Sequence, residues 1–276
     1  MLTCKEKNDI IVVKNTCMER KNKMKEKIEE RLEDQDVQVI VYETIDSTNA
    51  EAKRQAQSGA LSTPTLLVAK EQSAGRGRLG RNFLSRSGCG IYMSLLYFTG
   101  GELKDAVSVT TAAAVCVARA IERQIGGKMR IKWVNDIYNR RGKVAGILAE
   151  TVRVGERYAV IVGVGINTGQ EDFPEELVSI ASTVGELDEM ARCQVIADIT
   201  DALLEHAENC ADRTYMREYR DRFMLMDKAV NVIKDGETVM SGTVKGVDDE
   251  GGLLVMPLGE NQPVVIRSGE VSVRIK

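Results

Sequence analysis

Arginine and glycine alternate in the segment GRGRLGR at residues 75–81. The thirty residues from Gln72 to Gly101 around it contain four arginines and no Asp or Glu. Backbone N–H groups and guanidinium groups in such a loop can surround an anion, above all a phosphate. The segment is neither a Walker A loop nor a dinucleotide fingerprint. A solvated loop with surface salt bridges is the simpler alternative, but the long depletion of acidic residues favours anion binding.

A lysine, an amide and a carboxylate lie within the five residues Lys132–Asp136, beside Trp133, the only tryptophan. On one continuous strand, Lys132, Val134 and Asp136 would share a face. A carboxylate close to phosphates is typical of Mg²⁺ held jointly with substrate oxygens. The alternative is a core tryptophan followed by a local turn.

Glycines interrupt two apolar strands farther along the chain. Gly146 lies in the run that begins at Lys143, and Gly163, Gly165 and Asn167 fall on one face of the next run. Strand glycines often mark the close approach of a ligand, although a β-bulge is the alternative for each. Two glycines on one face favour a ligand floor. Lys143 on its own is more typical of a surface lysine.

Three consecutive hydrogen-bonding side chains, Ser47, Thr48 and Asn49, follow Asp46. They can cap a helix that begins at Ala50 and ends before Gly59. They can also recognise a polar ring such as a ureido group.

The elements that position these residues follow from hydrophobic patterning. Strands are predicted at Val37–Tyr42, Thr65–Lys70, Gly90–Phe98, Ile131–Tyr138, Val144–Val152 and Tyr158–Asn167, and helices at Leu103–Gln124 and over most of Asp188–Phe223. The turns after Tyr138 and Val152 are short, so the last three strands should form an antiparallel meander. Gly142 and Gly155 suit the positive φ of such turns.

The two ends of the chain differ from its middle. Residues 1–36 form a charged extension in which Met18–Gln35 is predicted to be a solvated helix with a thin apolar stripe at Met24, Ile28 and Leu32. Residues 37–225 form the main domain. Residues 226–276 read as short alternating strands typical of a small β-barrel. The predicted fold class is α+β.

Composition excludes much other chemistry. Only one histidine is present, His206, and the six cysteines form no CxxC pair, so zinc sites and histidine triads have little raw material. The 38 basic and 41 acidic residues argue against a protein that coats nucleic acid. No apolar run is long enough for a transmembrane helix and no signal peptide is evident, which predicts a cytoplasmic protein without a membrane partner.

Together these motifs resemble the biotin protein ligases. The matching stretches are DSTN at 46–49, EQSAGRGRLGR at 71–81, KWVNDIY at 132–138, KVAGILAE at 143–150 and GVGINT at 163–168, with Gly and Ser-Gly-Glu motifs in the tail. The resemblance covers residues 37–276. It implies an SH2-like catalytic domain, a mixed sheet backed by helices, followed by an SH3-like barrel. It also implies that biotin and ATP-Mg²⁺ form biotinyl-5′-AMP, and that biotin then passes to a lysine of a biotin carboxyl carrier protein, such as the acetyl-CoA carboxylase subunit.

The resemblance also implies residue roles. Arg78, Lys143 and Asp136 would be catalytic, and Asp136 would organise the metal or phosphate. The biotin site would comprise Ser47, Thr48, Asn49, Gln72, Arg76, Gly77, Arg78, Lys143, Gly146, Gly163 and Gly165. The adenylate site would comprise Arg76, Arg78, Arg81, Phe83, Asn135, Lys143 and Asn167.

The chain departs from the family pattern at three places. Phe83 stands where the family commonly has a tryptophan that stacks on adenine, and Val134 replaces a proline. The 36 residues before the first strand are too few for the DNA-binding domain of bifunctional members, so a monofunctional ligase that binds no DNA is expected. Lipoate–protein ligase, a biotin-dependent regulator and an inactive scaffold are the alternatives. An exposed sheet edge would suit a homodimer.

Overall fold

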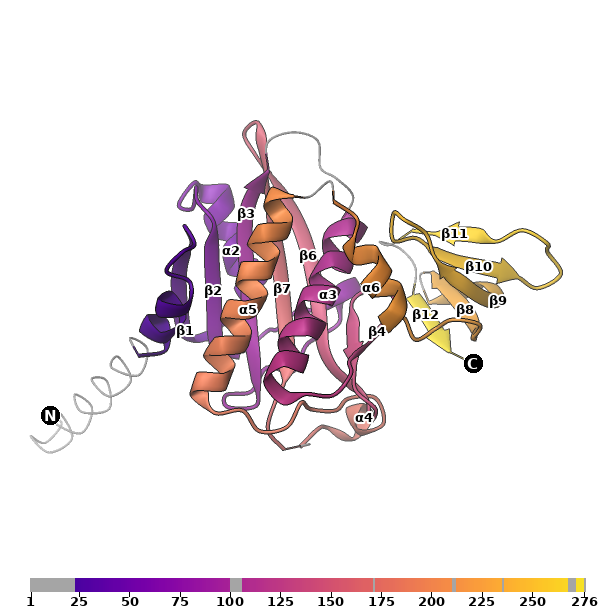
Figure 1. The fold of residues 1–276 in the computed structure, drawn as a ribbon, viewed down its shortest axis with the longest axis horizontal. Coiled ribbons are helices and arrows are strands. Elements are labelled where there is room, and N and C mark those ends of the chain that lie inside the picture. The colour runs from indigo at the N-terminus through magenta and orange to yellow at the C-terminus, as the bar shows by residue number, and fades with distance from the viewer. Residues whose placement is uncertain are drawn as a thin grey trace, which may run out of the picture.

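The computed structural model describes residues 23–99, 106–170, 172–209, 212–234, 236–267 and 272–275. These residues form a mixed seven-stranded sheet covered by helices, and a separate five-stranded antiparallel sheet near the C-terminus (Figure 1). The predicted α+β fold class is confirmed.

The large sheet has the strand order β1-β2-β3-β7-β6-β5-β4. Its strands are β1 (Gln38–Ile45), β2 (Thr65–Gln72), β3 (Gly90–Thr99), β4 (Arg130–Lys132), β5 (Asp136–Tyr138), β6 (Lys143–Val154) and β7 (Arg157–Asn167). Only β1 and β2 are parallel, because helix α2 (Thr48–Ser58) connects them across the sheet. Strands β4 to β7 form the predicted antiparallel meander.

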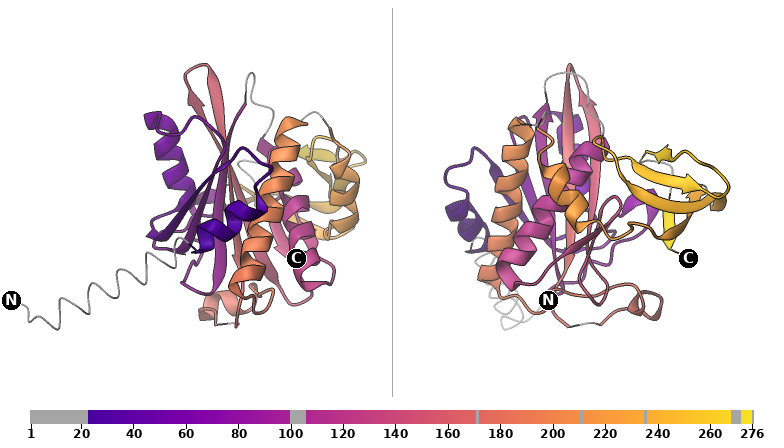
Figure 2. Two further views of the ribbon diagram at one scale, coloured as in Figure 1. Left: turned by 60° about the vertical axis from the view of Figure 1, so that its left-hand side comes forward. Right: turned by 45° about the vertical axis from the view of Figure 1, so that its right-hand side comes forward.

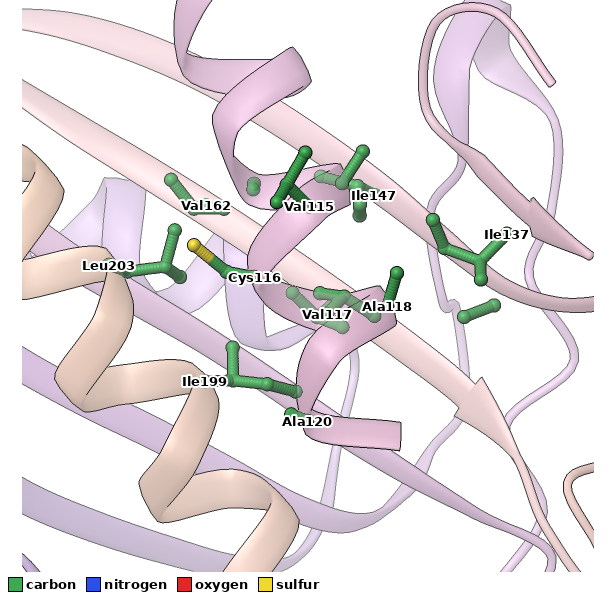
Figure 3. Close-up of a cluster of buried hydrophobic side chains, with 14 of the residues drawn as sticks. Val115, Cys116, Val117, Ala118, Ala120, Ile137, Ile147, Val162, Ile199 and Leu203 are labelled. Carbon is green, nitrogen blue, oxygen red and sulfur yellow. The ribbon is translucent and has the colours of Figure 1, made fainter. Parts of the chain in front are cut away.

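Helices cover the two faces of this sheet unequally. The long helices α3 (Ala106–Ile125) and α5 (Glu189–Glu208) lie across one face, where Val162 and Ile147 pack against Val115, Cys116 and Leu203 (Figure 3). The short helix α2 packs on the opposite face against residues such as Leu67, Leu96 and Ile161. Side chains alternate between faces along each strand. Helix α2 thus covers only the part of the second face that these residues form.

The helix near the N-terminus was predicted to be solvated, but its apolar stripe is buried against the rest of the protein. Residues 23–31 are helical, and Met24, Ile28 and Leu32 are 8%, 0% and 4% exposed. This helix lies beside α5 (Figure 2), where Lys27 pairs with Glu189 and Arg31 Nε donates to Gln194. The predicted helical residues 18–22 lie outside the described residues.

The small sheet has the order β11-β10-β9-β8-β12. Its strands are β8 (Ala229–Lys234), β9 (Glu237–Val247), β10 (Leu253–Pro257), β11 (Val264–Ile266) and β12 (Ser272–Ile275). The turn between β9 and β10 reaches the large domain: Trp133 Nε1 donates to the Gly251 carbonyl at 2.9 Å. Gly251 has φ +83°, and a Cβ there would lie 2.7 Å from Val107, so only glycine suits this contact.

Two local predictions were wrong. The chain does not form one strand over Ile131–Tyr138, because it reverses between β4 and β5 and brings Lys132 opposite Asp136. Lys132, Val134 and Asp136 therefore do not lie along one strand. Gly142 has no positive φ, unlike Gly155, since its role is steric: a Cβ there would lie 2.7 Å from the Ile180 carbonyl oxygen.

The remaining helices are short. Helix α4 (Glu175–Val178) lies in the segment around Pro174 that the sequence predicted to be irregular, and α6 (Tyr215–Arg222) packs against α3. A further 3₁₀ turn, η1, covers Arg78–Gly80. Across the described residues, none of the helices has the length and apolar character that a bilayer span requires.

Helix α6 is fixed to α3 by one buried guanidinium. Arg222 is 8% exposed, and its Nη2 donates to Glu218 at 2.6 Å and to Glu122 of α3 at 2.9 Å. Burial alone would raise the pKa of both carboxyls, but hydrogen bonds to arginine outweigh it, so both pKa values fall below their usual 4.5. The carboxylates therefore stabilise the fold above that pH, and this contribution disappears as the pH falls through their lowered folded-state pKa values.

We expect Arg222→Met to reduce the free energy of unfolding by about 2 kcal/mol at pH 7, because two partly buried carboxylates each lose one cationic partner. Urea denaturation measures this change. Arg217→Met, at an exposed position of the same helix, is the matched control and should change stability little. Equal stability of the two variants would contradict this role for Arg222.

Candidate active site

A row of four cross-strand neighbours, two of them glycines, crosses the face of the large sheet that α2 leaves uncovered. Gly165 of β7 is directly opposite Gly146 of β6, which is opposite Asp136 of β5, which is opposite Lys132 of β4. Directly opposed residues point to the same face. The row therefore begins with Gly165 and Gly146, which we call the glycine floor. It continues with the carboxylate of Asp136 and the ammonium group of Lys132. A cavity of about 1,200 Å³ lies over this row.

One end of the cavity is a buried hydrogen-bond network at the start of α2. Ser47 caps this helix, as predicted, and accepts from the Ala50 N–H. Asn49 is 3% exposed and donates to the Leu148 carbonyl at 3.1 Å and to Glu150 at 3.0 Å. The Thr48 N–H donates to Gln72 Oε1 at 2.8 Å. These amide and hydroxyl groups are therefore held rigidly.

Gly163 makes room for this network. A Cβ on Gly163 would lie 2.1 Å from Asn49 Oδ1, which is closer than any real contact. Its cross-strand partner is Ser94, whose hydroxyl lies 2.6 Å from Asn49 Oδ1 and 2.7 Å from Thr48 Oγ1. Sequence reasoning did not single out Ser94. The available signal was a lone serine inside the strand GIYMSLLYF, whose other residues are glycine, aliphatic or aromatic.

The Gly/Arg loop crosses the open side of the cavity. It leaves β2 and folds back on itself, with Arg76 bridged to Asn82 and the Gln72 amide donating to Ser85 Oγ at 2.8 Å. Arg78 Nη1 donates to Asn135 Oδ1 at 3.2 Å, which ties the loop to the reversal between β4 and β5. Burial lowers the pKa of Arg78, and the charge of Asp136 opposes that shift.

Aromatic and ionisable groups fill the middle of the cavity. The Phe83 ring lies on the glycine floor, because a Cβ on Gly165 would lie 2.5 Å from it. Lys143 Nζ lies 2.7 Å from Asp136 Oδ1, and both side chains are about three-quarters buried. Burial and the neighbouring Asp136 raise the pKa of Tyr138 to about 12. The phenol is therefore a neutral hydrogen-bonding group at physiological pH.

The charge balance of the cavity is strongly positive. Eight basic residues line it: Arg76, Arg78, Arg81, Arg130, Lys132, Arg140, Arg141 and Lys143. Asp136 is the only acidic residue of the described part of the chain that lines it. Such a cavity concentrates a multiply charged anion over an uncharged floor.

The structure brings together nearly all of the residues selected from the sequence. Fifteen of them line this one cavity: Ser47, Thr48, Asn49, Gln72, Arg76, Gly77, Arg78, Arg81, Phe83, Asn135, Asp136, Lys143, Gly146, Gly163 and Gly165. Asn167 does not line it. Its amide donates to the Ser182 carbonyl at 3.1 Å, so it holds the backbone beside Lys143 instead.

The donor set for a metal ion is small. No group of three or more His, Cys, Asp or Glu side chains comes together among the described residues. A single carboxylate, Asp136, fits a Mg²⁺ ion that takes most of its ligands from substrate phosphates and water.

Comparison with known proteins agrees with this geometry. Residues 41–167 match the model of the biotin/lipoate A/B protein ligase family, and residues 226–274 match the biotin protein ligase C terminal domain. The bifunctional ligase/repressor BirA of Bacillus subtilis is 33% identical over 233 residues, covering 79% of this chain and 69% of that protein. The biotin–[acetyl-CoA-carboxylase] ligase of Mycobacterium tuberculosis is 28% identical, covering 85% and 88%.

A solved structure extends the similarity to three dimensions. The biotin protein ligase from Aquifex aeolicus, in complex with biotin and ATP, superposes with a TM-score of 0.71 at 28% identity. The match covers 87% of this chain and 99% of that one.

We expect Gly163→Ala to reduce the free energy of unfolding by about 1–3 kcal/mol, because the new methyl group displaces Asn49 from its buried partners. Thermal or urea denaturation measures the loss. Gly165→Ala is the contrasting variant on the same strand face: its methyl group meets only the movable ring of Phe83 and should cost less. The opposite ranking would contradict this account of the network.

Proposed function

This chain belongs to the biotin/lipoate A/B protein ligase family, and from that premise we propose how its own residues carry the reaction of a biotin protein ligase. It activates biotin with ATP and transfers the biotinyl group to protein. The main support for these residue roles is the row of Gly165, Gly146 and Asp136. It lies between the buried network around Asn49 and the basic residues that line the cavity.

In the first step, a carboxylate oxygen of biotin forms a bond to the α-phosphorus of ATP. The bond from that phosphorus to the α,β-bridging oxygen breaks, and its electron pair leaves on pyrophosphate. Reactions of this kind depend on positioning and on charge stabilisation more than on proton transfer. A cavity rich in arginine and lysine, with no histidine among its lining residues, supplies that kind of catalysis.

The buried network at the start of α2 is the proposed biotin-ring site. Asn49 and Thr48 are fixed by neighbours and present amide and hydroxyl groups at one end of the floor. A ureido ring needs such fixed donors and acceptors. Gly163 makes room for Asn49, and Gly165 carries only the movable ring of Phe83. Ser94 extends this hydrogen-bond network beneath the ring, because its hydroxyl holds Asn49.

Lys143 and Arg78 are the proposed charge-stabilising groups. Lys143 lies next to the floor, with its Nζ 3.3 Å from the position of a Cβ on Gly146. There it meets both the biotin carboxylate and the α-phosphate once it exchanges its bond to Asp136. Arg78, on the loop, adds a second cation and closes over the mixed anhydride, which must be kept from water.

The nucleotide is proposed to lie over the centre of the floor. Phe83 and Asn135 border this region, and Arg76 and Arg81 lie on the loop above it. Mg²⁺ would accompany ATP as its phosphate counterion, with Asp136 as the protein ligand, and would neutralise phosphate charge.

In the second step, the unprotonated amine of a carrier-protein lysine attacks the carbonyl carbon of biotinyl-5′-AMP. An amide bond forms and AMP leaves with the electron pair of the broken bond to the phosphate oxygen. The acceptor is proposed to be a biotin carboxyl carrier protein, since several relatives are named biotin–[acetyl-CoA-carboxylase] ligases. A homodimer and a cytoplasmic location stay predictions from the sequence.

Lipoate transfer is the competing reaction within the same family. The biotin reading is favoured because the curated relatives and the Aquifex structure are named for biotin.

The test is incubation of the purified chain with ATP, Mg²⁺, biotin and an apo biotin-carrier domain, with lipoate in a parallel reaction. We expect the carrier to gain the mass of one biotin. Lys143→Ala should slow this at least about 100-fold, because a preorganised cation at the reacting phosphate is lost. Arg217→Ala, far from the site, should retain wild-type activity. If the carrier gains mass only with lipoate, the substrate is lipoate instead of biotin. If it gains mass with neither compound, the proposed ligase activity is wrong.

A further inference from the structure

Two arginines on the outer wall of the cavity have no side-chain hydrogen bond or ion pair within the described part of the chain. Arg130 on β4 and Arg140 on the turn after β5 both line the cavity and are exposed. Among the described arginines, those without a side-chain hydrogen bond, ion pair or ring contact are Arg76, Arg81, Arg130, Arg140 and Arg217, and all but Arg217 line this cavity. Unpaired cations that gather in one cavity indicate an anionic ligand.

Strand register places Arg130 close to the reacting groups. Arg130 is directly opposite Tyr138, which is opposite Lys143 across a one-residue bulge. Since neighbouring strands lie about 4.8 Å apart, β4 lies roughly 10 Å from the strand that carries Lys143. Arg130 thus lies two strands across from the beginning of β6, whereas the amide network of Asn49 lies farther along β6, at Leu148.

The turn that carries Arg140 is held in place. Asn139 Oδ1 accepts from the N–H groups of Arg141 and Gly142 at 2.8 and 2.9 Å, and Asn139 Nδ2 donates to the Thr183 carbonyl at 3.0 Å. Gly142 packs against the Ile180 carbonyl. A turn fixed in this way presents the guanidinium of Arg140 at low entropic cost.

The direction of the chemistry decides what these arginines meet. In an in-line displacement at phosphorus, the leaving group departs on the side opposite the nucleophile. With the biotin ring at Asn49, beside Leu148 of β6, and its carboxylate at Lys143, the nucleophile approaches along β6 toward the first residue of that strand. Pyrophosphate therefore departs toward the end of the sheet where β6 begins. Arg140 lies there on the preceding turn, and Arg130 lies there on β4.

We propose that Arg130 and Arg140 form the subsite for the β- and γ-phosphates of ATP and for the pyrophosphate that leaves. This inference rests on the proposed function and adds two residues that neither the Gly/Arg loop nor the other family motifs include. Forked guanidinium groups match diphosphate oxygens and stabilise the charge that develops on the leaving group.

The competing role for the same arginines is recognition of an acidic carrier surface, since both lie at the rim. The two roles separate because pyrophosphate takes part only in the first step and the carrier only in the second. Each step can be measured alone when the reaction starts from preformed biotinyl-5′-AMP.

The experiment compares the wild type with Arg130→Gln, Arg140→Gln and the control Arg217→Gln. Pyrophosphorolysis is followed as ATP formed from biotinyl-5′-AMP and Mg-pyrophosphate, and transfer as biotin on the carrier domain without pyrophosphate. For each cavity variant we expect kcat/KM for pyrophosphate to fall about 10- to 100-fold. Transfer should stay within about twofold of the control, because the lost contact is to pyrophosphate alone.

Other results would overturn the proposal in distinguishable ways. Pyrophosphorolysis equal to that of Arg217→Gln would show that neither arginine contacts the leaving group. An equal loss in pyrophosphorolysis and in transfer would assign the arginines to the carrier or to the adenylate. A wild-type protein that catalyses neither step would overturn the proposed function itself.

Discussion

The site depends on one constraint: the large sheet is buried on one face and must keep part of its other face open to a ligand. Helices α3 and α5 cover one face together with the helix of residues 23–31, whereas α2 covers only part of the other. Over the remainder, Gly146 and Gly165 carry no side chains, and the missing side chain of Gly163 makes room for Asn49. The backbone stays satisfied by the β-ladder, so the strands are rigid while their surface is open. The hydrogen bonds of the sheet therefore serve both stability and ligand access.

Each part of the site is attached to this bare strip. The amide network of Asn49 lies at one end because Gly163 leaves room for it, and Phe83 lies in the middle because Gly165 does. Asp136 continues the row because β5 pairs with β6 in that register. The reversal before β5 is in turn fixed by Arg78 from the loop and by Trp133, which donates to the small C-terminal sheet. A change in register would move all of these groups at once.

Local sequence patterns were sufficient to predict most helices and strands. They were insufficient to predict the contacts between residues that lie far apart in the sequence. Alternation and glycine punctuation predicted β3, β6, β7 and the C-terminal strands within a few residues. The reversal at Trp133 escaped, because the run IKWVNDIY contains no glycine or proline that would mark a turn. Ser94 and the outer arginines escaped because their significance depends on cross-strand neighbours that lie far away in sequence. Asn167 shares a strand face with the glycines, but the segment at Ser182 draws its amide away from the cavity.

The most direct test of the bare floor is to fill it without disturbing the fold. A Cβ on Gly146 would meet only the far ends of Lys143 and Phe83, at 3.3 and 3.6 Å, so Gly146→Val should fold normally. Isothermal titration with a non-hydrolysable analogue of biotinyl-5′-adenylate compares this variant with the wild type, after urea denaturation has verified equal stability. The account predicts that affinity falls at least about 100-fold, since ligand and side chain cannot share the space. Unchanged affinity in a stably folded Gly146→Val would show that the ligand does not lie on the glycine floor.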